Sequence, residues 1–383
     1  MKVTDLHTTE ERISFLKKSV SRFNERAQTH DEAATVPSEN FSELRAIGYP
    51  ALTVPKKYGG IGISLLEMIQ MQEIIAQQDG STALSIGWHM GITKHLGETN
   101  SWSESTYARF AEDVIKNGAL INNLATEPAT GSPTRGGKPE TFVTKIASGW
   151  KLNGRKSFAT LSPLLDFFVV SATIDGTEEV SNFLVKSDLP GVSIEETWDS
   201  IAMRGTGSHD VVFEDVTLEP EDLVQYVKPG QKRAQGWLLH IPACYLGIAK
   251  AAQKYAIDFA NSYSPSSIKG TISQFPAVKQ KIGEMELKVL ESSHFLYAVA
   301  KKWDDSDDTV RQTMQAELGA VKVSVVNKAI EIVDLAMRIV GARSLSATCP
   351  LQRYYRDVRA GLHNPPMDDM VISMLAAKWI NQK

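Results

Sequence analysis

The sequence predicts an α+β multidomain protein with a helical N-terminal domain, a middle antiparallel β domain and a C-terminal four-helix bundle. Helical spacing of apolar residues dominates to about residue 118, a period of two follows, and long helical patterns return near residue 232. A chain of 383 residues also exceeds the size at which one hydrophobic core stops growing. We therefore expect domains at 1–118, 119–228 and 229–383.

The composition is that of an ordinary globular protein, with 42% hydrophobic and 22% charged residues. A net charge of −4 gives no electrostatic case for a nucleic-acid partner. The chain has no apolar run of membrane-spanning length and does not begin as a signal peptide does, so we expect a cytoplasmic protein without a membrane partner. Cys244 and Cys349 stand far apart and are interpreted as reduced thiols, and no motif predicts a metal.

The N-terminal domain is predicted from periodicity and capping residues. Ile13, Leu16 and Val20 lie at helical spacing and indicate a helix from about residue 8 to 26. Ser101 and Glu104 have the spacing of a capping box for a helix that ends near residue 118. The other helices are expected at 38–46, 64–77 and 81–96.

The middle domain is predicted from alternation and turn residues. Asn153-Gly154 is the strongest short hairpin signal in the chain, and Ser148-Gly149 and Asp175-Gly176 mark further turns. The strands are expected at 141–146, 150–153, 167–174, 181–185 and 211–216. In the C-terminal domain, four long helices suit a bundle. They are expected at about 234–263, 276–304, 309–341 and 366–380.

Two stretches of the middle domain suit a flat ligand. In 121–132, Pro128 fixes its own φ and forces a turn at Glu127, and small residues then offer backbone N–H groups and two hydroxyls. In 152–160, strand alternation would place the Phe158 ring and the Thr160 hydroxyl on one face. The alternative interpretation is an ordinary strand-to-loop transition and a half-buried strand, with no ligand.

Together, Thr-Glu-Pro-x-x-Gly-Ser at 126–132 and Asn-Gly-x-Lys-x-Phe-x-Thr at 153–160 resemble the middle domain of the acyl-CoA dehydrogenase family. The resemblance extends over nearly the whole chain and implies that family's fold and an enzyme, a flavin-dependent oxidoreductase that binds FAD between these motifs. It implies that Leu124 and Thr126 contact the flavin pyrimidine and that Ser132 is a hydroxyl on the substrate side. Phe158 replaces the family's usual tryptophan over the ring, and Thr160 keeps its hydroxyl.

The catalytic base of the family is a glutamate at one of two places. Counting forward from Arg356-Asp357 places Pro365 at the first, and alignment of the first long helix of the bundle places Trp237 at the second. Neither residue accepts a proton. Asp368 or Asp369 is the substitute base if the proline pair at 365–366 reroutes the loop. Alternatively, both are acids that stabilise the N-terminus of the last helix.

A different set of residues resembles the flavin-dependent monooxygenases of the same fold, of the dibenzothiophene monooxygenase type. Leu-His-Asn-Pro at 362–365 is similar to their Leu-His-Asp-Pro. The resemblance implies that His363, His89 and a hydroxyl from Ser157 or Thr160 surround a flavin C4a-hydroperoxide. Alternatively, each histidine is a hydrogen-bonded core or helix-end residue.

The family's usual contact with a neighbouring subunit's FAD is altered in this chain. Arg338 and Arg343 stand where a Gln-x-x-Gly-Gly pattern is usual, and two arginines can hold a phosphate. The change permits FMN or a transiently bound reduced flavin in place of FAD. The family's bundle builds oligomers, so a homotetramer or homodimer is expected.

Three functions stay open on the sequence. The first is α,β-dehydrogenation of an acyl-CoA thioester, with hydride transfer to flavin N5 and an electron-transfer flavoprotein as partner. The second is a two-component monooxygenase that takes reduced flavin from a flavin reductase and acts on a small, possibly sulfur-containing molecule. The third is a catalytically silent flavin- or CoA-binding protein.

Overall fold

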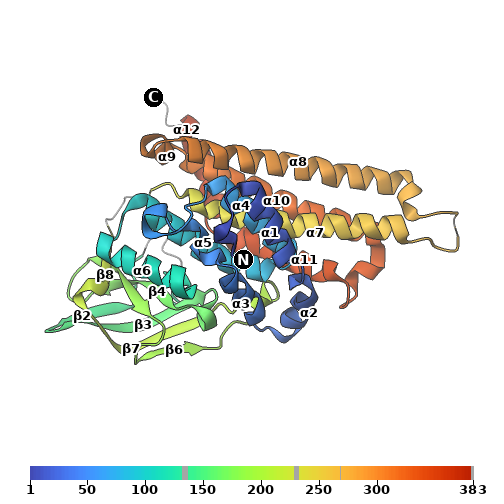
Figure 1. Cartoon of the computed structure of the whole chain (residues 1–383). Helices are drawn as coiled ribbons and strands as arrows, with labels where there is room; N and C mark the ends of the chain where they lie inside the picture. The colour runs from blue at the N-terminus through green and yellow to red at the C-terminus, as the bar shows by residue number, and fades with distance from the viewer. Residues whose placement is uncertain (132–136, 228–232, 268, 381–383) are drawn as a thin grey trace.

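The computed structural model describes residues 1–131, 137–227, 233–267 and 269–380. Six N-terminal helices, a sheet and a C-terminal helical bundle follow one another along the chain, as predicted. The sheet lies at one end of the molecule, and the long helices of the bundle extend away from it (Figure 1). The N-terminal helices pack against both the sheet and the bundle.

The N-terminal helices agree with the prediction at four of the five expected places, apart from their ends. They are α1 (Thr9–Ser19), α2 (Phe23–Ala33), α3 (Ser38–Ala46), α4 (Leu65–Ala76), α5 (Gly80–Thr99) and α6 (Glu104–Asn117). The single helix expected over 8–26 is wrong, because the chain turns after Val20. There the Ser21 hydroxyl donates to the Lys18 carbonyl at 2.8 Å, a local bond that competes with helical pairing. Helix α6 is capped by Ser103, not by Ser101.

The sheet has eight strands in the order β6-β7-β3-β2-β4-β5-β8, with β1 paired to β4. The strands are β1 (Ile121–Leu124), β2 (Phe142–Ile146), β3 (Gly149–Ala159), β4 (Phe167–Ile174), β5 (Val180–Lys186), β6 (Val192–Glu195), β7 (His209–Leu218) and β8 (Leu223–Val227). Its pairings are antiparallel except that β4 runs parallel to β1 and β2, so the sheet is mixed. Strand β1 leads directly from α6 into this sheet, which brings the first predicted ligand stretch beside the second.

The hairpin predicted at Asn153-Gly154 is wrong, because β3 runs straight through both residues. Asn153 instead pairs sideways with β7: its Oδ1 accepts from Asp215 N at 2.8 Å and its Nδ2 donates to Asp215 Oδ1 at 3.2 Å. Gly154 has a φ of +144°, and a Cβ there would lie 2.6 Å from the Cα of Thr141. The pair therefore forms a β-bulge, where the register shifts between Leu152 and Gly154.

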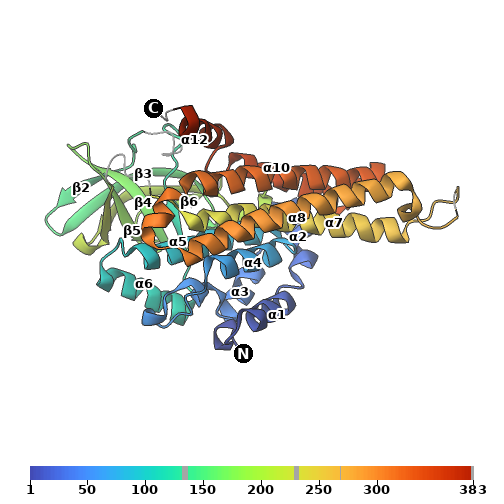
Figure 2. The ribbon, with the colours of Figure 1, turned by 90° about the horizontal axis from the view of Figure 1, so that it is seen from above.

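The C-terminal helices are α7 (His240–Ser262), α8 (Pro276–Asp305), α9 (Asp308–Thr313), α10 (Gln315–Val340), α11 (Pro350–Ala360) and α12 (Asp368–Ile380). Helices α7, α8 and α10 run side by side (Figure 2), and α11 packs against α7 and α10 as the fourth member of the bundle. The sequence reading missed α11, because Leu351 and Val358 are its only buried apolar residues. The predicted fourth helix, α12, packs on α10 at its end.

The N-terminal domain is bonded to the bundle through α4. Asp304 of α8 accepts from the backbone N–H groups of Leu65 and Leu66 at 2.7 and 2.9 Å, so a residue of another domain caps the helix. The buried Glu73 of α4 accepts from Lys250 Nζ and from Tyr297 OH, both at 2.7 Å. Within the described part of the chain, no helix is long and apolar enough to cross a membrane.

Replacing Asp304 by alanine should lower the free energy of unfolding by about 1–2 kcal/mol, because two helix-end N–H groups lose their acceptor. Asp305→Ala is the matched control, since Asp305 makes only an exposed pair with Lys301 of the preceding turn. Thermal denaturation of both variants measures the difference. Equal melting temperatures in the two variants would contradict the capping role.

Candidate active site

The two ligand stretches are joined by a buried ion pair between Glu127 and Lys156. Lys156 Nζ donates to Glu127 Oε1 at 2.6 Å, and the two residues are 0% and 3% exposed respectively. The carboxylate also accepts from the backbone N–H groups of Glu140 at 2.7 Å and Thr141 at 3.1 Å. With its oxygens bonded by both neighbouring segments, Glu127 fixes the turn after β1 against β2 and β3.

In this pair, each charged group stabilises the charged form of the other. Burial favours a raised pKa at Glu127, but the bonds from Lys156, Thr141 and Glu140 lower that pKa to about 2. Burial lowers the pKa of Lys156, and the adjacent carboxylate opposes that shift. A carboxylate bonded in this way is a poor proton acceptor, so Glu127 has a structural role.

The two stretches meet edge to edge beside this pair. The backbone N–H of Ser157 donates to the carbonyl of Thr126 at 2.9 Å, and Leu124 is buried at the end of β1. The Ser157 hydroxyl is buried and has no hydrogen-bond partner among the described residues. The structure thus brings Leu124, Thr126 and Ser157 together, whereas Ser132 lies outside the described residues.

Phe158 is the aromatic residue of the second stretch, and it is exposed. Its side chain is 64% exposed, its φ is +55°, and its ring packs edge-on against Trp198 at 6.1 Å. The register of β3 against β7 shifts between Lys156 and Ala159, so regular alternation does not fix the faces of the residues here. A common face for Phe158 and Thr160 stays a prediction. The Thr160 hydroxyl bonds Ser208 Oγ at 3.0 Å.

An exposed ring next to a buried hydroxyl without a partner fits a planar ligand that has polar edges. A flavin meets both requirements, because its ring system stacks on aromatic side chains and its edge carries hydrogen-bonding atoms. The residues of the second stretch therefore fit the predicted flavin. They are presented by a β-bulge and not by a regular strand.

His89 is a hydrogen-bonded core residue. Its Nε2 donates to the carbonyl of Pro50 at 3.1 Å, and its Nδ1 accepts from the backbone N–H of Ile121 at 3.2 Å. Burial lowers its pKa to about 4, so the ring is neutral. Because both nitrogens bond the backbone, these contacts do not support the predicted role of His89 beside the flavin. They attach α5 to the Pro50 segment and to β1.

His363 lies at the surface, at the end of the 3₁₀ helix Gly361–His363 between α11 and α12. The next residue, Asn364, accepts from the hydroxyl of the buried Tyr245 at 2.5 Å, which anchors the segment to α7. A catalytic role for His363 stays a prediction, because it requires a substrate that reaches this segment.

The two acids that follow begin helix α12. Asp368 accepts from the buried Lys322 at 2.9 Å and from Asn327 Nδ2 at 3.0 Å, both on α10. Burial opposes ionisation of Asp368, but these two bonds lower its pKa below the usual value. Asp368 therefore joins the first turn of α12 to α10, a role that neither interpretation of the sequence had predicted. Asp369 is exposed.

The two arginines lie at the C-terminal end of α10 and in the 3₁₀ helix that follows. Arg338 Nε pairs with Asp334 at 2.7 Å, and the guanidinium of Arg343 lies 4.3 Å from the centre of the Tyr263 ring. Both side chains are exposed. Their contact with a phosphate of a cofactor stays a prediction.

The sequence reading missed a cluster of aromatic rings between α5 and the start of α7, which we call the ring cluster: Trp88, Trp237 and His240. The His240 ring is parallel to Trp237 within 4° at 5.9 Å and stands at 72° to Trp88 at 4.9 Å. None of the ring nitrogens, Trp88 Nε1, Trp237 Nε1 and both nitrogens of His240, has a partner among the described residues. The spacing of Trp237 and His240, three residues apart, was the available signal.

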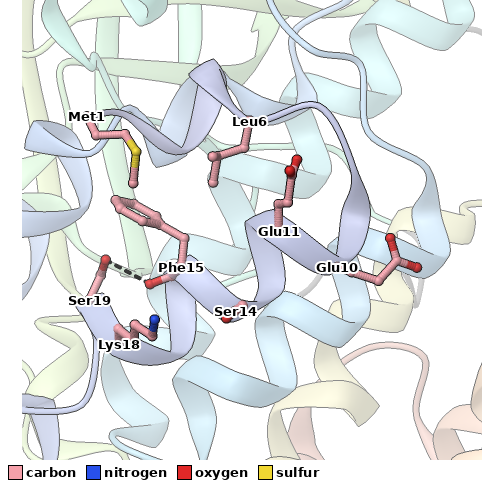
Figure 3. A pocket seen from close by; sticks show the side chains of 8 residues that line it. All are labelled: Met1, Leu6, Glu10, Glu11, Ser14, Phe15, Lys18 and Ser19. Carbon is pink, nitrogen blue, oxygen red and sulfur yellow. Dashed lines mark hydrogen bonds between the residues drawn. The ribbon is translucent and has the colours of Figure 1, made fainter.

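A surface hollow lies elsewhere, along α1. Met1, Leu6 and Phe15 form its apolar wall and Glu10, Glu11 and Lys18 its rim (Figure 3). It contains none of the predicted site residues. Among the described residues, no group of three or more histidine, cysteine or acidic side chains is placed to hold a metal ion.

Profiles of the three acyl-CoA dehydrogenase domains match this chain: the N-terminal domain at residues 10–99, the middle domain at 123–216 and the C-terminal domain at 239–364. YdbM of Bacillus subtilis, provisionally described as an acyl-CoA dehydrogenase, is 52% identical, and the match covers 93% of each chain. The chain therefore belongs to the acyl-CoA dehydrogenase family, whose members are flavin-dependent oxidoreductases.

Relatives with other activities match almost as much of the chain. L-evernosamine nitrososynthase of Micromonospora is 26% identical over 91% of this chain and 85% of its own. The structure of TdsC, a dibenzothiophene monooxygenase from Paenibacillus sp. A11-2, with FMN and indole superposes with a TM-score of 0.86 at 22% identity over 96% of both chains. That likeness shows a shared fold, and the family alone does not determine the reaction.

Replacing Glu127 by glutamine should lower the free energy of unfolding by about 3–5 kcal/mol, because the Lys156 ammonium is left buried without its counter-ion. The double variant Glu127→Gln/Lys156→Met should recover part of that loss. Chemical denaturation followed by circular dichroism measures both. A single variant as stable as the wild type would contradict the role of the pair.

The pH dependence of stability provides a second test of the same pair. Since the folded-state pKa of Glu127 is lowered to about 2, its contribution is present above the unfolded-state pKa near 4.3 and is lost as pH falls toward 2. Melting temperatures from pH 6 to pH 2 should therefore fall less steeply in Glu127→Gln than in the wild type. Parallel curves would remove Glu127 from the acid transition.

Proposed function

We propose that this protein is a flavin-dependent monooxygenase that uses reduced FAD or FMN and O₂ to oxygenate a small molecule. One observation carries the proposal: the two positions of the family's catalytic glutamate hold Trp237 and Pro365, and the neighbouring Asp368 is bonded to Lys322 and Asn327. Abstraction of an α-proton needs a carboxylate in reach of the substrate, whereas oxygen transfer does not.

The flavin would be held by the paired stretches of the middle domain. The Phe158 ring supplies an exposed face for the ring system, and the Ser157 hydroxyl supplies a buried hydrogen-bonding group at its edge. When bound in reduced form, flavin supplies the two electrons for the reaction. One oxygen atom of O₂ then enters the substrate, and the other leaves as water with two protons. A flavin reductase is the expected partner, because the proposed substrate does not reduce the flavin.

The chain itself would position the substrate and exclude water. Trp88 and Trp237 stand 5.8 Å apart at 69° and form apolar walls at the start of α7. Glu127 and Lys156 hold the two flavin stretches together. Exclusion of bulk water favours transfer of oxygen to the substrate over its loss to solvent.

Dehydrogenation of an acyl-CoA thioester is the second candidate, favoured by the description of the 52% identical YdbM. Asp369, exposed at the start of α12, would be the base, and an electron-transfer flavoprotein the electron acceptor. In this reaction the Asp369 carboxylate would take the α-proton, and a bound flavin would supply the acceptor for the hydride from the β-carbon.

One experiment separates the two reactions. The flavin-loaded protein is titrated anaerobically with acyl-CoA thioesters of different length, and its flavin absorption is recorded. We expect no bleaching, and we expect incorporation of one ¹⁸O atom when the protein receives ¹⁸O₂, a flavin reductase and heteroatom-bearing or aromatic compounds. Bleaching that is lost in Asp369→Asn and kept in Asp369→Glu would establish dehydrogenation instead.

Phe158→Ala should weaken flavin binding about three- to tenfold, the loss expected for one aromatic stacking contact. Phe142→Ala is the matched control, because Phe142 is an exposed ring on β2, outside both stretches. Quenching of flavin fluorescence gives the two dissociation constants. Equal effects in both variants would count against the proposed flavin face.

A further inference from the structure

The ring cluster contains hydrogen-bonding groups that the fold leaves without partners. Buried polar groups are almost always paired, and each one left unpaired costs about 1–3 kcal/mol. Here Trp88 Nε1, Trp237 Nε1 and both nitrogens of His240 are buried without a partner among the described residues. By contrast, the neighbouring His89 and Gln72 bond the backbone, the latter to Ala83 O at 2.5 Å.

Two glycines of α5 make room for the rings. A Cβ on Gly87 would lie 2.4 Å from His240 Nδ1, and one on Gly91 would lie 2.4 Å from Trp237 Cε3. One helical turn apart, they let His240 and Trp237 pack directly on the helix backbone. The rings are therefore closely packed against α5. Loose packing does not explain why their nitrogens have no hydrogen-bond partner among the described residues.

The cluster is uncharged. Burial lowers the pKa of His240 to about 3, and no neighbouring charge contributes to that shift. A neutral imidazole has one N–H donor and one acceptor nitrogen, and each indole has one N–H donor. The four nitrogens thus provide three donors and one acceptor, held between flat aromatic faces.

We propose that the ring cluster is the substrate-recognition site and that it takes a small, uncharged, planar molecule with a hydroxyl or N–H group. Such a group donates to the free nitrogen of His240, and a hydroxyl oxygen also accepts from an indole N–H. A charged ligand is disfavoured, since nothing in the cluster compensates its desolvation. The inference names the substrate class of the proposed function and rests on it only for the reaction.

Phenol and toluene form a matched pair of probes, because they have nearly the same size and differ in one hydroxyl. Binding of each to the flavin-loaded protein is measured by isothermal titration calorimetry. We expect phenol to bind at least tenfold more tightly, the effect of one net hydrogen bond, although toluene is the more apolar. Equal affinities, tighter binding of toluene, or no binding of either would overturn the proposal.

His240→Phe keeps the aromatic wall and removes both nitrogens, so it should abolish the preference for phenol. Trp88→Phe should reduce the preference, and it serves as the second variant if His240→Phe does not fold. Tyr49→Phe is the control: its hydroxyl is also buried without a partner, but it lies outside the cluster. A preference for phenol unchanged in both cluster variants would overturn the proposal.

The binding test and the ¹⁸O experiment distinguish failure of the recognition site from failure of the proposed reaction. Selective binding of phenol without incorporation of oxygen would leave the recognition site in place and remove the monooxygenase. Oxygenation of small compounds with no effect of His240→Phe on the affinity for phenol would support the proposed function and remove the ring cluster from recognition.

Discussion

The buried Glu127–Lys156 pair is the contact on which the candidate site depends. The turn after β1 and the bulged end of β3 are separated along the chain, and they meet through the bond from Ser157 N–H to the Thr126 carbonyl. A lysine with no exposed surface and a carboxylate bonded by two backbone N–H groups hold them at one distance. A buried ion pair of this kind adds little net stability compared with apolar residues in its place. Removal of one partner is costly, because the other charge is left buried alone, so any arrangement that separates the two segments is disfavoured.

Polar side chains also join segments elsewhere in the fold. Asp304 of α8 caps α4, and Asp368 ties α12 to α10. His89 of α5 bonds the Pro50 carbonyl with one ring nitrogen and the Ile121 N–H of β1 with the other. Asp368 and His89 are also residues for which the sequence predicted a catalytic role. Their partners leave them little capacity for it, because a carboxylate or imidazole that is fully hydrogen-bonded by the fold is neither a strong base nor a free donor.

The ring cluster shows the opposite condition. Its rings are as well packed as the rest of the core, but its nitrogens have no partner among the described residues. Unpaired polar groups in a tightly supported cluster point to function more directly than a histidine in a familiar position does. This contrast between His89 and His240 favours the start of α7 over His89 of α5 as a place where a substrate is recognised.

The sequence alone determined the three-part architecture, because periodicity, capping and turn residues are local signals that recur over long segments. Its resemblance to the family at 126–132 and 153–160 also predicted the two flavin stretches. Only the tertiary structure decided that Asn153-Gly154 is a bulge and that α11 belongs to the bundle. Partners distant in sequence made both choices: Asp215 for the first, and α7 and α10 for the second. The hydrogen bonding of His89 and of His240 was decided in the same way, because a side chain's hydrogen bonds depend on which segments the fold brings beside it.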